Sequence, residues 1–253
     1  IIYAGTIIGV FFLMQTNIIR ALGDSRTPTI MLALALCINI VLEPVAILVL
    51  GWGVPGAALA TVTAQLIGNI ICFIYIMKKV PLLHIRREDW KIERKILVEH
   101  LKIGLPMAFQ SSIIAIGAVI LQAALNHLGA TAVAAYAASQ KVDAIAMMPM
   151  MSFGMAMAAY TAQNYGAHKM HRIEEGVKKC IMMSVSFSIV AGLFNIFCGP
   201  FIMELFVGAG ETQVISYGQT YLTVNGVCYW ILSLLFIFRY TLQGLGQSVV
   251  PTI

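Results

Sequence analysis

Ionisable side chains are rare inside the long apolar stretches of this sequence, and three of them lie deep within such a stretch. Glu43 lies in the second stretch, while Lys141 and Asp143 lie in the fifth. If these stretches cross a bilayer, a charged group near its centre costs at least about 2.5–3.5 kcal/mol on insertion scales, so such residues indicate function. The chemistry open to them is binding of a proton, a small cation or a charged solute.

Glu43 has a polar neighbour one helical turn earlier, because Asn39 precedes it by four residues and shares its helix face. A carboxylate and an amide oxygen on one face can hold a small cation or stabilise a protonated acid. The structural alternative is that Glu43 is a satisfied acid beside a bend at Pro44. We favour the functional interpretation.

Lys141 and Asp143 are two residues apart, which places them about 200° apart around a straight helix, so they do not pair directly there. We predict that Asp143 lines a cavity and that Lys141 is its neutralising neighbour. The alternatives are that each charge has a partner on another helix, or that both are purely structural. Three amides inside apolar stretches are further cavity candidates, with contacts between helices as the alternative: Gln65, Gln110 and Gln140.

The composition excludes a soluble domain. Hydrophobic residues make up 60% of the 253 residues, charged residues only 11%, and the mean hydropathy is +0.88. Seven apolar runs are each long enough to cross a bilayer as a helix. They lie at about 1–19, 28–50, 56–77, 103–126, 131–158, 180–207 and 213–238. The sequence therefore predicts an all-α polytopic membrane protein.

Basic residues are concentrated in alternate breaks between these runs. Every Lys and Arg except Lys141 lies in the first, third, fifth or seventh break. This positive-inside asymmetry places those breaks in the cytoplasm. We expect a multi-pass protein of the plasma (cytoplasmic) membrane. The net charge of +5 is thus explained by topology and lipid contact, and we expect no nucleic-acid partner.

The third break divides the chain. We predict three transmembrane helices in 1–80, a cytoplasmic linker with a short amphipathic helix in 81–102, and four transmembrane helices with the start of a fifth in 103–253. The sequence begins and stops inside apolar stretches, so we interpret it as an internal piece of a longer chain.

A short segment of the sequence recurs. Residues 21–30 read ALGDSRTPTI and residues 244–253 read GLGQSVVPTI, with six of ten positions identical at an offset of 223. Each copy follows an apolar run with a basic residue at its cytoplasmic end. A period of 223 contains six spans, and an even number gives both copies the same orientation. The repeat predicts two six-helix lobes related by a parallel repeat, only partly covered by this chain.

With these features, the sequence resembles the multidrug and toxic compound extrusion (MATE) family. The resemblance is carried by the loop at 20–28, by NIVLEP at 39–44, GVPGAALAT at 53–61 and GLP at 104–106, and by Ala156 with QNYGA at 163–167. It implies twelve helices in two lobes, with the seven spans here as helices four to ten, followed by the start of helix eleven.

The resemblance also implies a coupling site. Asn39 and Glu43 match an Asn-x-x-x-Asp pair of the N-lobe ion site, and Thr61 matches a hydroxyl from the next helix. Here the acid is Glu rather than the usual Asp, and the usual aspartate of helix one lies outside this chain. Some members carry an acid a few residues after GLP, but 107–113 has none. We therefore predict coupling at Asn39, Glu43 and Thr61.

The resulting functional expectation is a monomeric secondary active antiporter that exports amphipathic, mainly cationic drugs or toxic compounds in exchange for Na⁺ or H⁺. The alternative is a flippase for a lipid-linked saccharide precursor, which would need several cavity arginines for pyrophosphate. No nucleophile–base pair, phosphate loop or metal motif is evident, so we expect neither an enzyme nor a cofactor or metal site.

Overall fold

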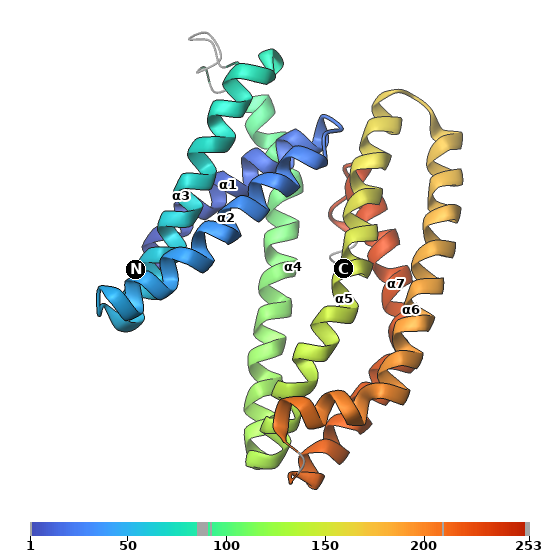
Figure 1. Cartoon of the computed structure of the whole chain (residues 1–253). Coiled ribbons are helices and arrows are strands. Elements are labelled where there is room, and N and C mark those ends of the chain that lie inside the picture. The colour runs from blue at the N-terminus through green and yellow to red at the C-terminus, as the bar shows by residue number, and fades with distance from the viewer. Residues whose placement is uncertain (1, 85–90, 92, 209, 251–253) are drawn as a thin grey trace. The chain divides into compact units, whose positions relative to one another are not determined.

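The computed structural model describes residues 2–84, 91, 93–208 and 210–250, and Figure 1 shows its course. Within these residues the protein is helical and contains no strand. Seven helices of the described part are long and apolar enough to cross a membrane, which confirms the predicted all-α class and the span count. The helices form two compact units, residues 1–92 and 93–253, and each is described below by itself.

Unit 1 is a small helical bundle centred on α3. Its elements are α1 (Ile2–Ala21), α2 (Arg26–Pro44), the π-helical segment η1 (Val45–Val49), α3 (Gly53–Lys79) and the 3-10 segment η2 (Pro81–Leu83). Helix α3 packs against both α1 and α2. It presents buried small residues along one face, Gly56, Ala60, Ala64 and Gly68. Small residues let helix backbones approach closely, which is how helices associate in lipid.

The turn between α1 and α2 is stabilised by Asp24, whose carboxylate accepts hydrogen bonds from the backbone N–H groups of Arg26 and Thr27, each 3.0 Å long. The Tyr75 hydroxyl of α3 donates a third, 3.3 Å long. Hydrogen bonds from the Thr27 side chain and backbone lower the pKa of Asp24, because they stabilise the charged form. This turn is therefore bound to the end of α3.

The sequence repeat is also a structural repeat. Gly23 and Gly246 both end a helix in the left-handed conformation, with φ of +95° and +78°. Two backbone hydrogen bonds around each glycine recur at the same offset of 223 residues. They are Gly23 N–Arg20 O (2.9 Å) with Gly246 N–Gln243 O (2.9 Å), and Asp24 N–Ile19 O (3.3 Å) with Gln247 N–Leu242 O (2.9 Å).

Unit 2 consists of α4 (Arg94–His127), α5 (Ala130–Gly166), α6 (Met170–Val207) and α7 (Thr212–Gly244). Helices α5, α6 and α7 pack pairwise, while α4 lies beside α5 and has no buried residue. Residues 94–102, expected in a separate linker helix, instead form the first turns of α4, because the chain there has no helix breaker. Residues 85–90 and 92 of the expected linker lie outside the described residues.

Contact between α6 and α7 depends on glycine. The backbones of Gly192 and Gly226 meet so closely that a Cβ atom on Gly226 would lie 3.0 Å from the Gly192 carbonyl oxygen. Eight residues from Gly192, the buried hydroxyls of Ser184 and Ser233 form a 2.7 Å hydrogen bond between the same two helices. Close backbone approach and an interhelical hydrogen bond together hold α6 against α7.

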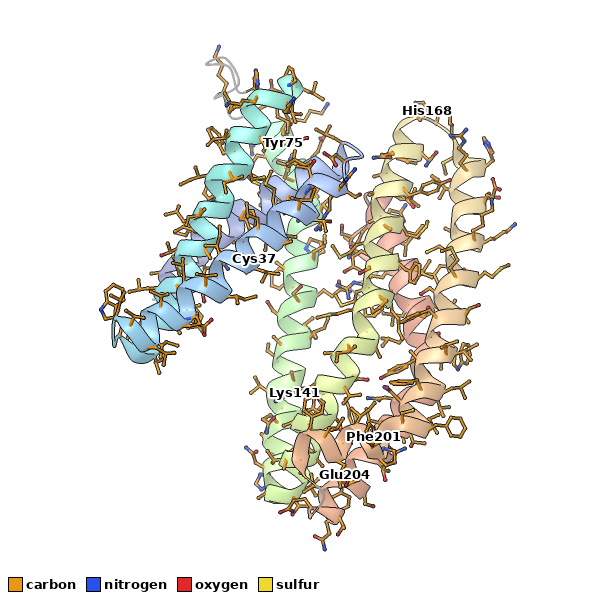
Figure 2. All side chains as sticks on the ribbon, viewed as in Figure 1. Cys37, Tyr75, Lys141, His168, Phe201 and Glu204 are labelled. Atoms are coloured by element: carbon orange, nitrogen blue, oxygen red, sulfur yellow. The ribbon has the colours of Figure 1, made fainter. Side chains whose placement is uncertain are left out.

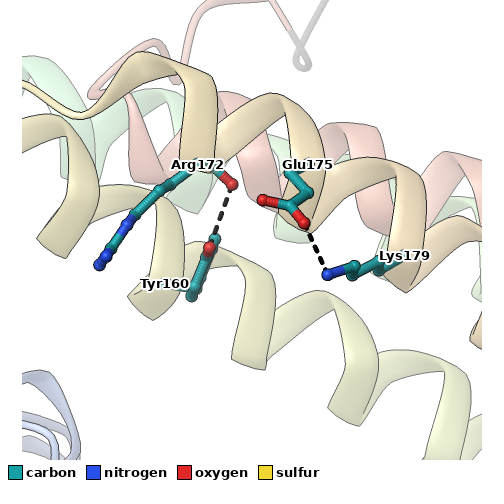
Figure 3. A network of polar contacts seen from close by, with 4 residues as sticks. All are labelled: Tyr160, Arg172, Glu175 and Lys179. Carbon is teal, nitrogen blue, oxygen red and sulfur yellow. Dashed lines mark hydrogen bonds and ion pairs between the residues drawn. The ribbon is translucent and has the colours of Figure 1, made fainter.

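Figure 3 shows two polar contacts near the turn between α5 and α6, of which one joins the two helices and the other lies within α6. The Tyr160 hydroxyl donates to the Arg172 carbonyl at 3.0 Å, and Lys179 pairs with Glu175 at 2.7 Å. The ion pair is exposed on both sides, so it contributes little to stability. Both contacts lie at the end that the loop charges place in the cytoplasm.

Candidate functional site

In unit 1, the second and third helices bring two of the predicted coupling residues together. The Asn39 amide of α2 donates a 3.4 Å hydrogen bond to the Thr61 hydroxyl of α3. That hydroxyl donates in turn to the Ala57 carbonyl, 3.0 Å away, within its own helix. Among the described residues, no further hydrogen bond involves the side-chain carbonyl oxygen of Asn39 or the Thr61 hydroxyl. Such oxygens are the ligands that hard cations prefer.

These two side chains line a pocket of about 210 Å³ in which Gln65 supplies a third polar group. Gln65 follows Thr61 by one helical turn, and its amide lies against Gly9 of α1, where a Cβ would come within 3.1 Å of the Gln65 Oε1. Glycine at this position gives the amide room. The other lining residues are Gly9, Phe12, Leu13, Leu32, Ala35, Leu36 and Ala64.

Glu43 lies one turn beyond Asn39, near the end of α2, and is half-buried. It is not among the residues that line this pocket. Within the described residues it takes part in no ion pair or side-chain hydrogen bond. The next residue, Pro44, ends α2, and the chain continues as the π-helical η1. Proline and a wider helical turn are both recognised causes of a bend, so Glu43 lies at a deformable point.

In unit 2, Asp143 is the centre of a polar cluster built by three helices. Its carboxylate on α5 is 8% exposed and accepts the hydrogen bond of the Tyr229 hydroxyl on α7. The Asn195 amide on α6 donates to the same hydroxyl oxygen at 2.9 Å. The Tyr221 phenol, two turns earlier on α7, also interacts with Asp143. The cluster is buried, and each group has a polar partner.

Lys141 is not the neutralising neighbour that the sequence suggested. Its ammonium group lies 5.8 Å from the centre of the Phe206 ring on α6, and the residue is exposed. The only ion pair within the described residues joins Glu175 to Lys179. The reason is geometric, since a continuous α5 turns residues 141 and 143 to different faces. Figure 2 shows Lys141 on α5, near the end of the bundle where Phe201 and Glu204 lie.

The other two candidate amides belong to unit 2. Gln110 of α4 lines an apolar pocket of about 440 Å³ that also contains Arg239 of α7. Gln140 is exposed and donates a 2.5 Å hydrogen bond to the Tyr136 hydroxyl one turn earlier on α5. Neither amide is among the residues that line the unit 1 pocket.

The chain matches the profile of the MatE family over residues 106–253, more than half of its length. The chain belongs to the MatE family. This confirms the family that the sequence resembled. MatE proteins are transporters, and the seven apolar helices make this one a multi-pass membrane protein.

Two curated relatives illustrate how much of a MatE protein is present. The probable multidrug resistance protein YoeA of Bacillus subtilis (strain 168) is 28% identical, over 96% of this chain and 53% of its own length. An FAD transporter of Shewanella oneidensis (MR-1) is 24% identical, over 96% of this chain and 54% of its own length. The chain therefore spans about half the length of the curated relatives it matches.

A solved structure supports the same fold. It is described as the outward-facing conformation of a multidrug resistance MATE family transporter of the MOP superfamily. The TM-score is 0.90 at 23% identity, and the match covers 99% of this chain and 56% of that one. At this identity the likeness is one of fold.

Two residues of the Asp143 cluster were not predicted from the sequence. Tyr229 and Asn195, the partners of Asp143, lie in apolar runs and were not identified as candidates. The position of Asn195 in the middle of α6 could have identified it as a candidate, because an amide within the membrane requires a hydrogen-bond partner. Nothing in the sequence specified that this partner is Tyr229.

Proposed function

We propose that this MatE protein is a secondary active antiporter of the plasma membrane that exports amphipathic organic cations in exchange for Na⁺ or H⁺. The observation that carries the proposal is the polar pocket in unit 1, where Asn39, Thr61 and Gln65 meet inside an otherwise apolar bundle. Polar groups at membrane depth are costly, so their presence there indicates binding of a solute or an ion. Resemblance of Asn39 and Thr61 to the family's ion-site motif supports the same conclusion.

Glu43 supplies the charge in this mechanism. It lies one turn from Asn39 and has no ion pair or side-chain hydrogen bond within the described residues, so its carboxylate is available to take up a proton or help hold a cation. Neutralising Glu43 removes the charge next to Pro44 and η1, where the helix is easiest to deform. Uptake of the coupling ion thereby shifts the equilibrium between two forms of α2, and with it access to the transport pathway.

The alternative, flipping of a lipid-linked saccharide, has less support. A site for pyrophosphate requires several cationic groups directed into one cavity. Lys141, the deepest cation of the sequence, lies on an exposed face beside Phe206.

The test is ethidium efflux from proteoliposomes containing the intact protein, with the Na⁺ and pH gradients varied separately. Glu43→Gln, which keeps the size and removes the charge, is expected to lower ion-dependent efflux at least tenfold. Glu43→Asp, which restores the family's usual acid, is expected to retain it. The matched control is Glu204→Gln on the exposed surface of α6. Unchanged efflux and unchanged ion dependence in Glu43→Gln would sink the proposal.

A further inference from the structure

Unit 2 has an aromatic pocket to which neither the family match nor the candidate residues assign a role. It measures about 320 Å³ and lies where α4 ends, α5 begins and α7 passes. Three of its lining residues are tyrosines, Tyr136, Tyr217 and Tyr221, and the others are Leu125, Leu128, Ala132 and Ala135. Its size is at the lower end of the range for small-molecule sites.

Two of the tyrosine rings are fixed before any ligand arrives. Tyr136 and Tyr221 meet edge to face, with ring centres 5.5 Å apart and planes at 89°. The Gln140 amide holds the Tyr136 hydroxyl at 2.5 Å. Rings held in place lose little freedom when a ligand binds, so the pocket is preorganised.

The third tyrosine is positioned by the contact between α5 and α7. The buried Ser139 hydroxyl of α5 donates a 3.3 Å hydrogen bond to the carbonyl of Gly218, the residue after Tyr217. Glycine at this position allows the close approach, because an added Cβ would lie 2.9 Å from the Ser139 hydroxyl oxygen. This contact fixes the α7 backbone that carries Tyr217.

The charge next to this pocket is negative. Tyr221 both lines the pocket and interacts with Asp143, whose carboxylate is buried and forms no ion pair within the residues that the structure describes. Lys141, the nearest cation along α5, is instead directed at Phe206. A buried carboxylate without a countercharge makes the pocket attractive to a positive ligand.

We propose that this pocket binds the aromatic or quaternary ammonium part of an organic cation. The electron-rich ring faces of Tyr136, Tyr217 and Tyr221 contact the cation, the Asp143 carboxylate supplies long-range attraction through Tyr221, and Leu125 with Leu128 contacts the apolar body. The inference rests on the proposed function, since it gives the exported cation a place in unit 2. It differs from the coupling site, which lies in unit 1.

The test is equilibrium binding to the intact protein in lipid nanodiscs without any ion gradient. The probes are N-methylquinolinium and its uncharged isostere 1-methylnaphthalene. Tyr217→Leu is expected to weaken quinolinium binding roughly 5- to 30-fold, the equivalent of a cation–π contact of about 1–2 kcal/mol, and to leave methylnaphthalene binding within about twofold. Tyr217→Phe keeps the ring and is expected to bind quinolinium nearly as tightly as wild type.

The matched control is Tyr165→Leu, because Tyr165 is a similarly exposed tyrosine on α5 at 50%, against 59% for Tyr217. Asp143→Asn supplies a second readout and is expected to weaken binding of the cation but not of the neutral probe. Equal losses for both probes, or unchanged quinolinium binding in Tyr217→Leu and Asp143→Asn, would overturn the proposal. Binding is measured without transport, so this outcome is separate from failure of the Glu43 mechanism.

Discussion

The hydroxyl of Tyr229 on α7 donates its hydrogen bond to the buried carboxylate of Asp143 on α5, and this contact joins two residues that are 86 positions apart in sequence. The Asn195 amide of α6 completes the cluster from the third side. The side chains of Asp143, Asn195 and Tyr229 are all buried. The contribution of the cluster to stability is therefore best measured by removing one partner at a time.

Tyr229→Phe is expected to destabilise unit 2 by about 1–3 kcal/mol, because the buried Asp143 carboxylate loses a hydrogen-bond donor. The double variant with Asp143→Asn is expected to cost less than the sum of the two single changes, since the two residues interact. Thermal unfolding of the purified protein in detergent measures both. Tyr240→Phe on the same helix is the control, and a strictly additive double variant would contradict the coupling.

Gly192→Ala is expected to destabilise the α6–α7 contact, since the added methyl group meets the backbone of Gly226 rather than a flexible side chain. Overpacking of this kind costs about 1–3 kcal/mol. Gly117→Ala on α4 is the matched control, because a Cβ there has no neighbour within 4 Å. We expect Gly192→Ala to have a lower apparent melting temperature than wild type and Gly117→Ala to have the same one. Equal melting temperatures of the two variants would argue against the close contact.

Asp24 makes the α1–α2 turn sensitive to acid. Its pKa in the folded protein is lowered by hydrogen bonds from Thr27, so the carboxylate stabilises the fold above the unfolded pKa of about 3.9 and loses this effect as the pH falls through the lower folded value. Asp24→Asn is therefore expected to be less stable than wild type at pH 7, and this difference is expected to become smaller at pH 3. The apparent melting temperatures at these two pH values provide the measurement. If the melting temperatures of wild type and Asp24→Asn differ by the same amount at both pH values, the Asp24 charge does not stabilise the turn.

Much of the fold was predictable because lipid imposes few solutions on a chain. Run length and hydropathy gave the seven helices, and the recurrence of Gly23 at Gly246 gave a turn that repeats down to its backbone hydrogen bonds. The exact extents were not predictable: α5 continues to Gly166 and α4 begins at Arg94, because a helix does not have to end at the membrane surface.

The candidate sites were predictable only where the residues are close in sequence or match a family motif. Asn39 and Thr61 were expected to meet, and they lie in hydrogen-bond contact. The partner of Asp143 was not predicted, because Tyr229 approaches it through the packing of α5 on α7, which no local pattern encodes. For Lys141 the prediction was wrong. Its nearness to Asp143 in the sequence suggested a pairing that the geometry of a continuous helix prevents.

The contact between Asn39 and Thr61 gives the sharpest test of the proposed coupling site. Thr61→Val keeps the shape and removes the hydroxyl that accepts the Asn39 hydrogen bond, while Thr61→Ser keeps the hydroxyl. Loss of one such group is worth about 1 kcal/mol, so Thr61→Val is expected to raise the coupling-ion concentration for half-maximal ethidium efflux roughly fivefold. Thr61→Ser is expected to resemble wild type, as is Thr63→Val, which alters an exposed threonine of the same helix. If Thr61→Val and Thr63→Val shift the ion dependence equally, the Thr61 hydroxyl has no specific part in coupling.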